Sequence, residues 1–178
     1  MFAPSAPPRV IVGVDDSDAS RWALSWALGE ARLRGMELLL VHVAPVPSYA
    51  AAAGVPGHGT VCGLREAGGE LITRLLTELR SSGGCDPARV SGMTLLGAPG
   101  DALVRLAREE DILVVGRSSR GLLSRLVRPS VHRHCAAHAR ATFICVAPPT
   151  IGPLTVPGAD GERPARRRLW GRRHETDG

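Results

Sequence analysis

Residues 9–18 read RVIVGVDDSD, and this stretch decides the fold. Its first six residues are rich in β-branched side chains and almost wholly apolar, which is typical of a strand buried in a parallel sheet. Polar residues follow at once, with Ser17 placed to cap a helix and Asp18 placed favourably in its first turn. We expect this helix to continue to about Arg34 and to end at Gly35.

The rest of the chain repeats the same alternation of strand and helix. Further strands are predicted at 37–43, 89–96, 111–115 and 142–147, and further helices at 64–81, 98–108 and 130–139. The strand at 89–96 has mixed polarity, which favours a place near an edge of the sheet. Such alternation predicts an α/β fold with parallel strands joined by right-handed crossovers.

Two features of the helical segments predict how they pack. The first helix carries a face of small residues one turn apart, at Ala23, Ala27 and Ala31. Trp22 and Trp26 lie one turn apart on the same helix, and we interpret them as packing residues rather than as a binding platform. The segment 44–63 between the second strand and the next helix lacks periodicity, so it is predicted to be a long loop.

Composition divides the chain into three parts. Residues 1–8 are read as an N-terminal extension, 9–148 as the folded domain, and 149–178 as a disordered Arg-rich tail. All 22 basic residues are Arg, and the tail holds six of them, so the domain itself is only mildly positive. A mildly positive domain makes nucleic acid an unexpected partner, although the tail's Arg166–Arg173 run leaves that alternative open.

The spacing of the cysteines and the character of the N-terminal residues predict the cellular compartment. Cys62, Cys85, Cys135 and Cys145 have no CxxC spacing, and no signal peptide or membrane-spanning run is apparent. We therefore expect free thiols and a cytoplasmic protein. Cys145 is predicted to be a small core residue, and Cys62, in the long loop, is the best candidate for a reactive thiol.

Ligands of open parallel sheets bind beyond the carboxyl ends of the strands, where the strand order reverses. If the first and fourth strands are central neighbours, the loops that begin at Asp15 and Gly116 meet there. The loop from Gly116 to Ser130 is the expected centre of a ligand site.

Several segments, taken in order, resemble the universal stress protein family over roughly residues 9–147. They are the opening strand and acidic turn at 10–17, Leu-Val-His-Val at 40–43, the turn at 97–103, Asp-Ile-Leu-Val-Val-Gly-Arg-Ser at 111–118, and the ending at 130–148. The resemblance implies an open five-stranded parallel sheet in the order 3-2-1-4-5 with helices on both faces. Such a fold is Rossmann-like, of the adenine-nucleotide-hydrolase-like kind.

In the nucleotide-binding branch of that family, one loop reads Gly, two residues, Gly, nine residues, Gly, then Ser or Thr. Glycines allow close approach to phosphates, and bare N–H groups with the next helix N-terminus hold the anion. The same frame here reads Gly116, Ser119 and Pro129-Ser130. Two of three glycines are replaced, and proline also lacks an N–H and fixes φ.

The resemblance implies ATP, or a related adenine nucleotide, as the ligand. By the resemblance, Asp15 and Val43 are expected near the ribose and adenine, and Gly13 is a further expected cofactor-binding residue. The residues expected near the phosphates are Gly116, Arg117, Ser119, Arg120 and Ser130. Arginines at 117, 120, 125 and 128 could offset the lost backbone donors with charge. The open alternative is a member that binds no nucleotide, whose loop is simply basic and solvated.

Metal binding is expected only as Mg²⁺ that accompanies ATP, held by a carboxylate such as Asp15 beside the phosphates. Asp16 and Asp18 are better explained by helix capping and the helix dipole. The cluster of His132, His134, Cys135 and His138 resembles a zinc set, but no second cluster supplies further ligands. No resident metal ion is predicted.

Two classes of function follow. The first is a cytoplasmic stress-response regulator that binds an adenine nucleotide. The second is a non-nucleotide-binding, dimeric interaction or scaffold protein of the same fold. The resemblance implies a homodimer through the last strand, where residues 143–146 form an apolar edge. We expect no enzyme, since no catalytic triad or dyad stands out, although slow ATP hydrolysis stays open.

Overall fold

A computed structural model describes residues 6–46, 58–83, 86–117 and 130–149. The strands of its parallel sheet are β1 (Arg9–Gly13), β2 (Glu37–Ala44), β3 (Val90–Leu96), β4 (Ile112–Gly116) and β5 (Thr142–Val146). They lie in the order β3-β2-β1-β4-β5, so the expected order is confirmed, and β3 is an edge strand as its mixed polarity indicated.

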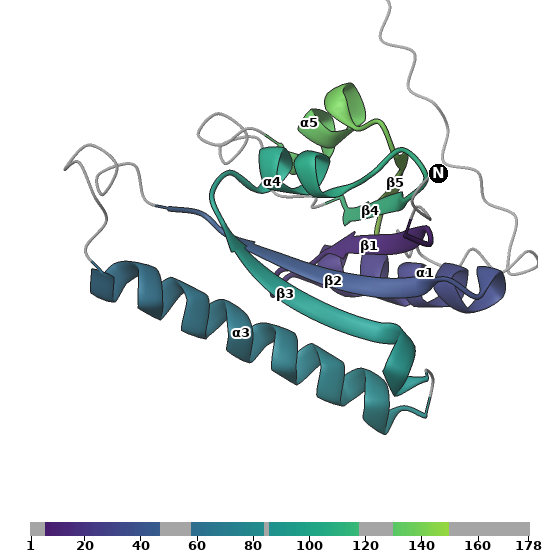
Figure 1. Cartoon of the computed structure of the whole chain (residues 1–178), viewed down its shortest axis with the longest axis horizontal. Helices are drawn as coiled ribbons and strands as arrows, with labels where there is room; N and C mark the ends of the chain where they lie inside the picture. The colour runs from purple at the N-terminus through teal and green to yellow at the C-terminus, as the bar shows by residue number, and fades with distance from the viewer. Residues whose placement is uncertain (1–5, 47–57, 84–85, 118–129, 150–178) are drawn as a thin grey trace, which may run out of the picture.

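Helices cover both faces of the sheet (Figure 1). On one face lie α1 (Asp18–Arg34) and α3 (His58–Ser81), and on the other lie α4 (Pro99–Leu106) and α5 (Val131–His138). A short 3₁₀ turn, η1 (Pro87–Arg89), precedes β3. Because β1 and β4 are sandwiched between these layers, their side chains from Val10 to Val12 and from Leu113 to Val115 are at most 3% exposed. Such burial explains why these strands read as unbroken apolar runs.

The first helix forms where its sequence predicts. The Ser17 hydroxyl accepts a hydrogen bond from the Ser20 amide at 3.3 Å, and Gly35 ends the helix in the left-handed conformation at φ 63°. Ala23, Ala27 and Ala31 are buried against the sheet. The interpretation of the two tryptophans of this helix as packing residues was wrong.

Trp22 and Trp26 do not pack in the core. Their side chains are 48% and 36% exposed, because they lie beside the small-residue face rather than within it. The exposed surface of α1 thus carries two large aromatic rings in a protein whose aromatic residues make up 3% of the chain.

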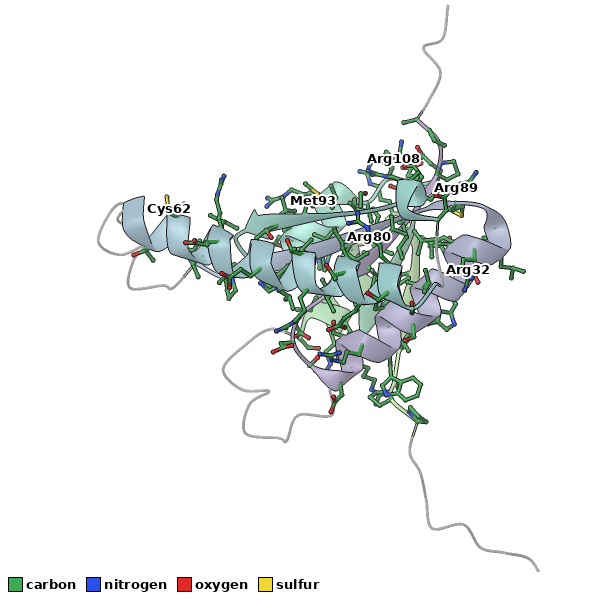
Figure 2. All side chains as sticks on the ribbon, turned by 90° about the horizontal axis from the view of Figure 1, so that it is seen from below. Arg32, Cys62, Arg80, Arg89, Met93 and Arg108 are labelled. Carbon is green, nitrogen blue, oxygen red and sulfur yellow. The ribbon has the colours of Figure 1, made fainter. Side chains whose placement is uncertain are left out.

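The fourth element along the chain, α3, differs most from its prediction. Helix α3 begins at His58 rather than at about residue 64, so part of the predicted long loop is helical. Cys62 therefore lies exposed on this helix, near one end of it (Figure 2), and not in a loop. Residues 47–57 of the predicted loop lie outside the described residues, as do Cys85 and the tail from 150 onward.

Cys145 was also placed wrongly. It lies on the edge strand β5, and its side chain is exposed, whereas Cys135 on α5 is fully buried. The place of β5 at the edge of the sheet explains the error, because an edge strand is covered less on both faces than a central strand. None of the described helices is both long and apolar enough to cross a membrane.

A buried carboxylate fixes the amino end of the sheet. Asp111, just before β4, is 0% exposed and accepts hydrogen bonds from the Arg9 amide at 2.9 Å and from the Arg108 guanidinium at 2.9 and 3.1 Å. Burial raises the pKa of Asp111, but the hydrogen bonds from Arg108 and Arg9 outweigh it and lower the pKa to about 2. Arg108 also donates to the carbonyls of Ala6 and Pro7, and so holds the N-terminal segment (Figure 2).

Candidate functional site

Polar groups gather at the carboxyl ends of β1 and β4. Asp111 lies at the opposite, amino end of the strands. The two strands are direct neighbours, with Gly13 paired to Val115. Successive connections leave this point in opposite directions, because β1 leads to β2 on one side and β4 leads to β5 on the other. Such a switch point is where open parallel sheets place their ligands.

Asp15 begins the turn between β1 and α1. Its Oδ1 atom accepts hydrogen bonds from both the amide, at 3.0 Å, and the hydroxyl of Ser17. Its own amide donates to the Ser20 hydroxyl at 2.9 Å. The turn is therefore fixed by short-range hydrogen bonds, and the Asp15 side chain remains exposed. Its second carboxylate oxygen has no protein partner among the residues that the structure describes.

The other acids of the turn have different surroundings. Asp16 pairs with Arg74 of α3 at 2.7 Å and lies 3.9 Å from Arg21. Asp18 stands in the first turn of α1, where a negative charge complements the helix dipole. Asp16 thus joins two helices on one face of the sheet, whereas one carboxylate oxygen of Asp15 has no partner among the described residues.

The end of β2 supports the same turn. The Nδ1 atom of His42 lies 2.9 Å from the Val14 carbonyl oxygen, and the Val14 amide donates to the Val41 carbonyl at 2.9 Å. Val43 follows on the other face, where its side chain is 7% exposed within the core cluster. Val43 can therefore offer a ligand its backbone more readily than its side chain.

Both glycines of the expected set meet close neighbours. A Cβ atom added to Gly116 would lie 2.3 Å from the Ala19 carbonyl oxygen, and one added to Gly13 would lie 3.0 Å from Leu103. Gly116 lets the first turn of α1 approach the end of β4 more closely than any side chain would allow. Packing alone therefore accounts for a glycine at this position.

The far side of the site comprises Arg117 and Ser130. Arg117 is exposed, and its amide donates to the Val146 carbonyl at 2.7 Å, so its backbone is fixed to β5. Ser130 occupies the N-cap position of α5, but its hydroxyl makes no capping hydrogen bond. It lies 2.6 Å from Nδ1 of His132 instead, so Ser130 occupies the N-cap position without capping the helix through its hydroxyl.

The other residues expected in the site belong to the loop between Arg117 and Ser130. Ser119, Arg120, Arg125, Arg128 and Pro129 lie outside the described residues. Six residues of the expected site are described, and all lie at the carboxyl ends of the strands: Gly13, Asp15, Val43, Gly116, Arg117 and Ser130.

The histidines of α5 have partners of their own. His134 Nε2 lies 2.8 Å from the Asp101 carboxylate on α4, and its ring stacks on His138 with centroids 4.4 Å apart. Cys135 points into the core, where burial raises the pKa of its thiol to about 11. Within the described ranges, no group of three or more His, Cys, Asp or Glu side chains could hold a metal ion.

Two residues that support the Asp15 turn, one on α1 and one on β2, were not predicted from the sequence. Ser20 had no role assigned, and His42 served only as part of a family motif. A polar side chain near the end of an otherwise apolar strand was the available signal for His42. Ser20 carried no such signal, because a serine in the first turn of a helix is common.

The fold and the site together define a class: an open parallel α/β domain with an acid, a hydroxyl and an arginine at its switch point. Comparison with known proteins makes the class specific. The model of the universal stress protein family matches residues 8–147 of this chain. The chain belongs to the universal stress protein family.

Solved structures agree with this assignment. Universal stress protein UspA from Lactobacillus plantarum is 16% identical, with a TM-score of 0.57, over 79% of this chain and 96% of that one. A universal stress protein from Archaeoglobus fulgidus is 24% identical, with a TM-score of 0.55, over 79% and 98% of the two chains. A universal stress protein in complex with cAMP is 25% identical, with a TM-score of 0.51, over 80% and 98%.

Proposed function

We propose that this protein binds an adenine nucleotide, with ATP as the expected ligand, at the switch point between β1 and β4. The observation that carries the proposal is the fixed turn at Asp15, which leaves one carboxylate oxygen without a partner among the described residues, just beyond the carboxyl end of β1 and next to β4. The similar universal stress protein that was solved in complex with cAMP supports the class of ligand.

The described residues suit such a ligand. The Asp15 carboxylate can accept hydrogen bonds from ribose hydroxyls, since one oxygen is committed to Ser17 and the other is available. Arg117 and the Ser130 hydroxyl can donate to phosphate oxygens at the amino end of α5, where the helix dipole favours an anion. The backbone of Val43, at the end of β2, is available to the base.

Mg²⁺ would accompany ATP rather than reside in the protein. Magnesium prefers carboxylate and phosphate oxygens and keeps several waters, so one protein carboxylate and the phosphates suffice. Asp15 fits this role better than Asp16, because Arg74 neutralises Asp16.

We further propose that the protein acts as a cytoplasmic regulator and not as an enzyme. Nucleotide occupancy at the switch point would alter the surface that Asp15, Arg117 and Ser130 present to a protein partner. A homodimer that forms through β5 would present two such sites, because β5 follows the loop and α5 directly.

Isothermal titration with ATP, AMP and cAMP tests the proposal. The wild type should bind, and Asp15→Asn should weaken binding about 10- to 100-fold, since a hydrogen bond to a charged group contributes roughly 1.5–3 kcal/mol. Asp18→Asn is the matched control, because it removes one negative charge from the same turn and should leave affinity unchanged.

The alternative function is a dimeric interaction protein that binds no nucleotide. The replacement of two loop glycines by Ser119 and Pro129 favours it, because Pro129 cannot donate a backbone hydrogen bond. No detectable heat at high micromolar ATP and AMP, and no nucleotide retained through purification, would establish this alternative.

A further inference from the structure

The side chain of His42 on β2 reaches the residue that directly follows β1, next to the candidate site. We propose that His42 is a positioning residue for the nucleotide site, which holds the Val14 carbonyl and thereby fixes the backbone that presents Asp15. The inference rests on the proposed function, and it concerns a residue that would not itself touch the ligand.

The hydrogen bond defines the state of the imidazole. Nδ1 of His42 lies 2.9 Å from the Val14 carbonyl oxygen, which can only accept. Nδ1 must therefore carry the proton and donate. Val14 is 4% exposed, so without this donor its carbonyl would have little access to water.

The hydrogen bond from His42 holds the peptide unit that directly precedes Asp15. Val14 lies beyond the last residue of β1, and its amide still pairs with the Val41 carbonyl at 2.9 Å. His42 holds the carbonyl of the same residue, and the next amide, that of Asp15, donates to the Ser20 hydroxyl. Three consecutive backbone groups are thus held just before the Asp15 side chain.

Packing keeps the imidazole in place. His42 pairs in register with Thr94 on β3, and α3 passes over both at Gly68. A Cβ atom at Gly68 would lie 2.4 Å from Thr94 Cγ2 and 2.9 Å from His42 Cδ2. The ring therefore fits between helix and sheet with little room to rotate, which preorganises the donor.

Two substitutions of similar size separate the hydrogen bond from packing. In His42→Asn the amide nitrogen takes the place of Nδ1 and can still donate to the Val14 carbonyl. In His42→Leu the volume is similar but the donor is lost. Thr94→Val is the matched control, since it alters the same contact and removes a buried hydroxyl that has no hydrogen-bond partner in the structure.

The measurements are hydrogen exchange of the Val14 and Asp15 amides by NMR without ligand, and the Kd for ATP by titration. We expect His42→Leu to speed exchange and to weaken binding by about five- to tenfold, the scale of one lost hydrogen bond. His42→Asn and Thr94→Val should stay within about twofold of the wild type in both measurements. Melting curves identify any variant that is not folded.

The outcomes separate the inference from the proposed function. If the wild type binds no nucleotide, the proposed function and the positioning role fall together. If the wild type binds and folded His42→Leu has the same Kd, the positioning role alone is overturned. Equal losses in His42→Leu and His42→Asn would also overturn it, because packing rather than the donor would then be responsible.

Discussion

Asp111 is a single residue on which one end of the sheet depends. Its folded pKa of about 2 lies below the ordinary 3.8, so its ionised form is stabilised by folding. This contribution is complete above about pH 4 and is lost as the pH falls toward 2. The shift corresponds to about 2 kcal/mol.

We therefore expect Asp111→Asn to lower the free energy of unfolding by about 2–4 kcal/mol at pH 7, because Arg108 and Arg9 lose their charged partner. The difference from the wild type should shrink as the pH is lowered from 5 to 2. Urea denaturation at several pH values measures both effects.

Glu109→Gln provides the control for Asp111. Glu109 is exposed and lies 3.8 Å from the exposed Arg140, and such surface pairs contribute about 0–1 kcal/mol. A pH-independent difference between Asp111→Asn and the wild type would contradict the assignment of the stabilisation to the ionised carboxylate.

Single residues also show where sequence analysis stops. The Ser17 cap and the Gly35 terminus of α1 were predictable because both depend on local backbone geometry. The reason for Gly116 was not, because its closest neighbour, the Ala19 carbonyl, comes from a distant part of the chain. A family motif identified the position, and the fold added a second cause for the glycine.

At the scale of elements, alanine substitutions at two adjacent glycines of α3 should change the stability of the protein in opposite directions. Gly68 faces β3 without room for a Cβ atom, whereas an added Cβ atom at Gly69 would have nothing within 4 Å. Gly68→Ala should destabilise the protein by about 1–3 kcal/mol through overpacking. Gly69→Ala should stabilise it by up to about 1 kcal/mol, since alanine favours a helix.

Thermal or urea denaturation of these two variants checks the packing of α3 against the sheet. Both variants change the same helix by one methyl group, so each serves as the control for the other. Equal effects on stability would mean that α3 does not approach β3 as closely as the structure indicates.

The elements themselves were largely predictable from sequence periodicity. Strands and helices were found within a few residues of their bounds, except at the start of α3. There the segment from His58 to Gly63 contains two glycines and no apolar stripe, so local propensity gave no helix signal. Continuation of a helix whose later turns pack on the sheet accounts for the difference.

At the scale of the whole molecule, β5 leaves one edge of the sheet unpaired among the described residues. We expect a homodimer in which this strand pairs with its copy about a two-fold axis. Analytical ultracentrifugation should then show a dimer at tens of micromolar. Cys145→Lys, which adds an exposed charge to β5 of both copies, should shift the protein toward monomer.

Cys62→Lys is the matched control for this experiment. Cys62 is also exposed, but it lies on α3, away from β5, so its replacement should leave the association state unchanged. A wild type that sediments only as a monomer would contradict the expected dimer.

The pairing of Arg9 with Asp111 joins positions that are 102 residues apart. A ribosome releases the chain from its N-terminus at roughly 5–20 residues per second, so β1 waits about 5–20 s for β4 to emerge. During this interval the strand that becomes the centre of the sheet has one edge of unpaired backbone N–H and C=O groups open to incorrect pairing. The rate of translation across residues 10–111 therefore governs how long the nascent chain is exposed to misfolding.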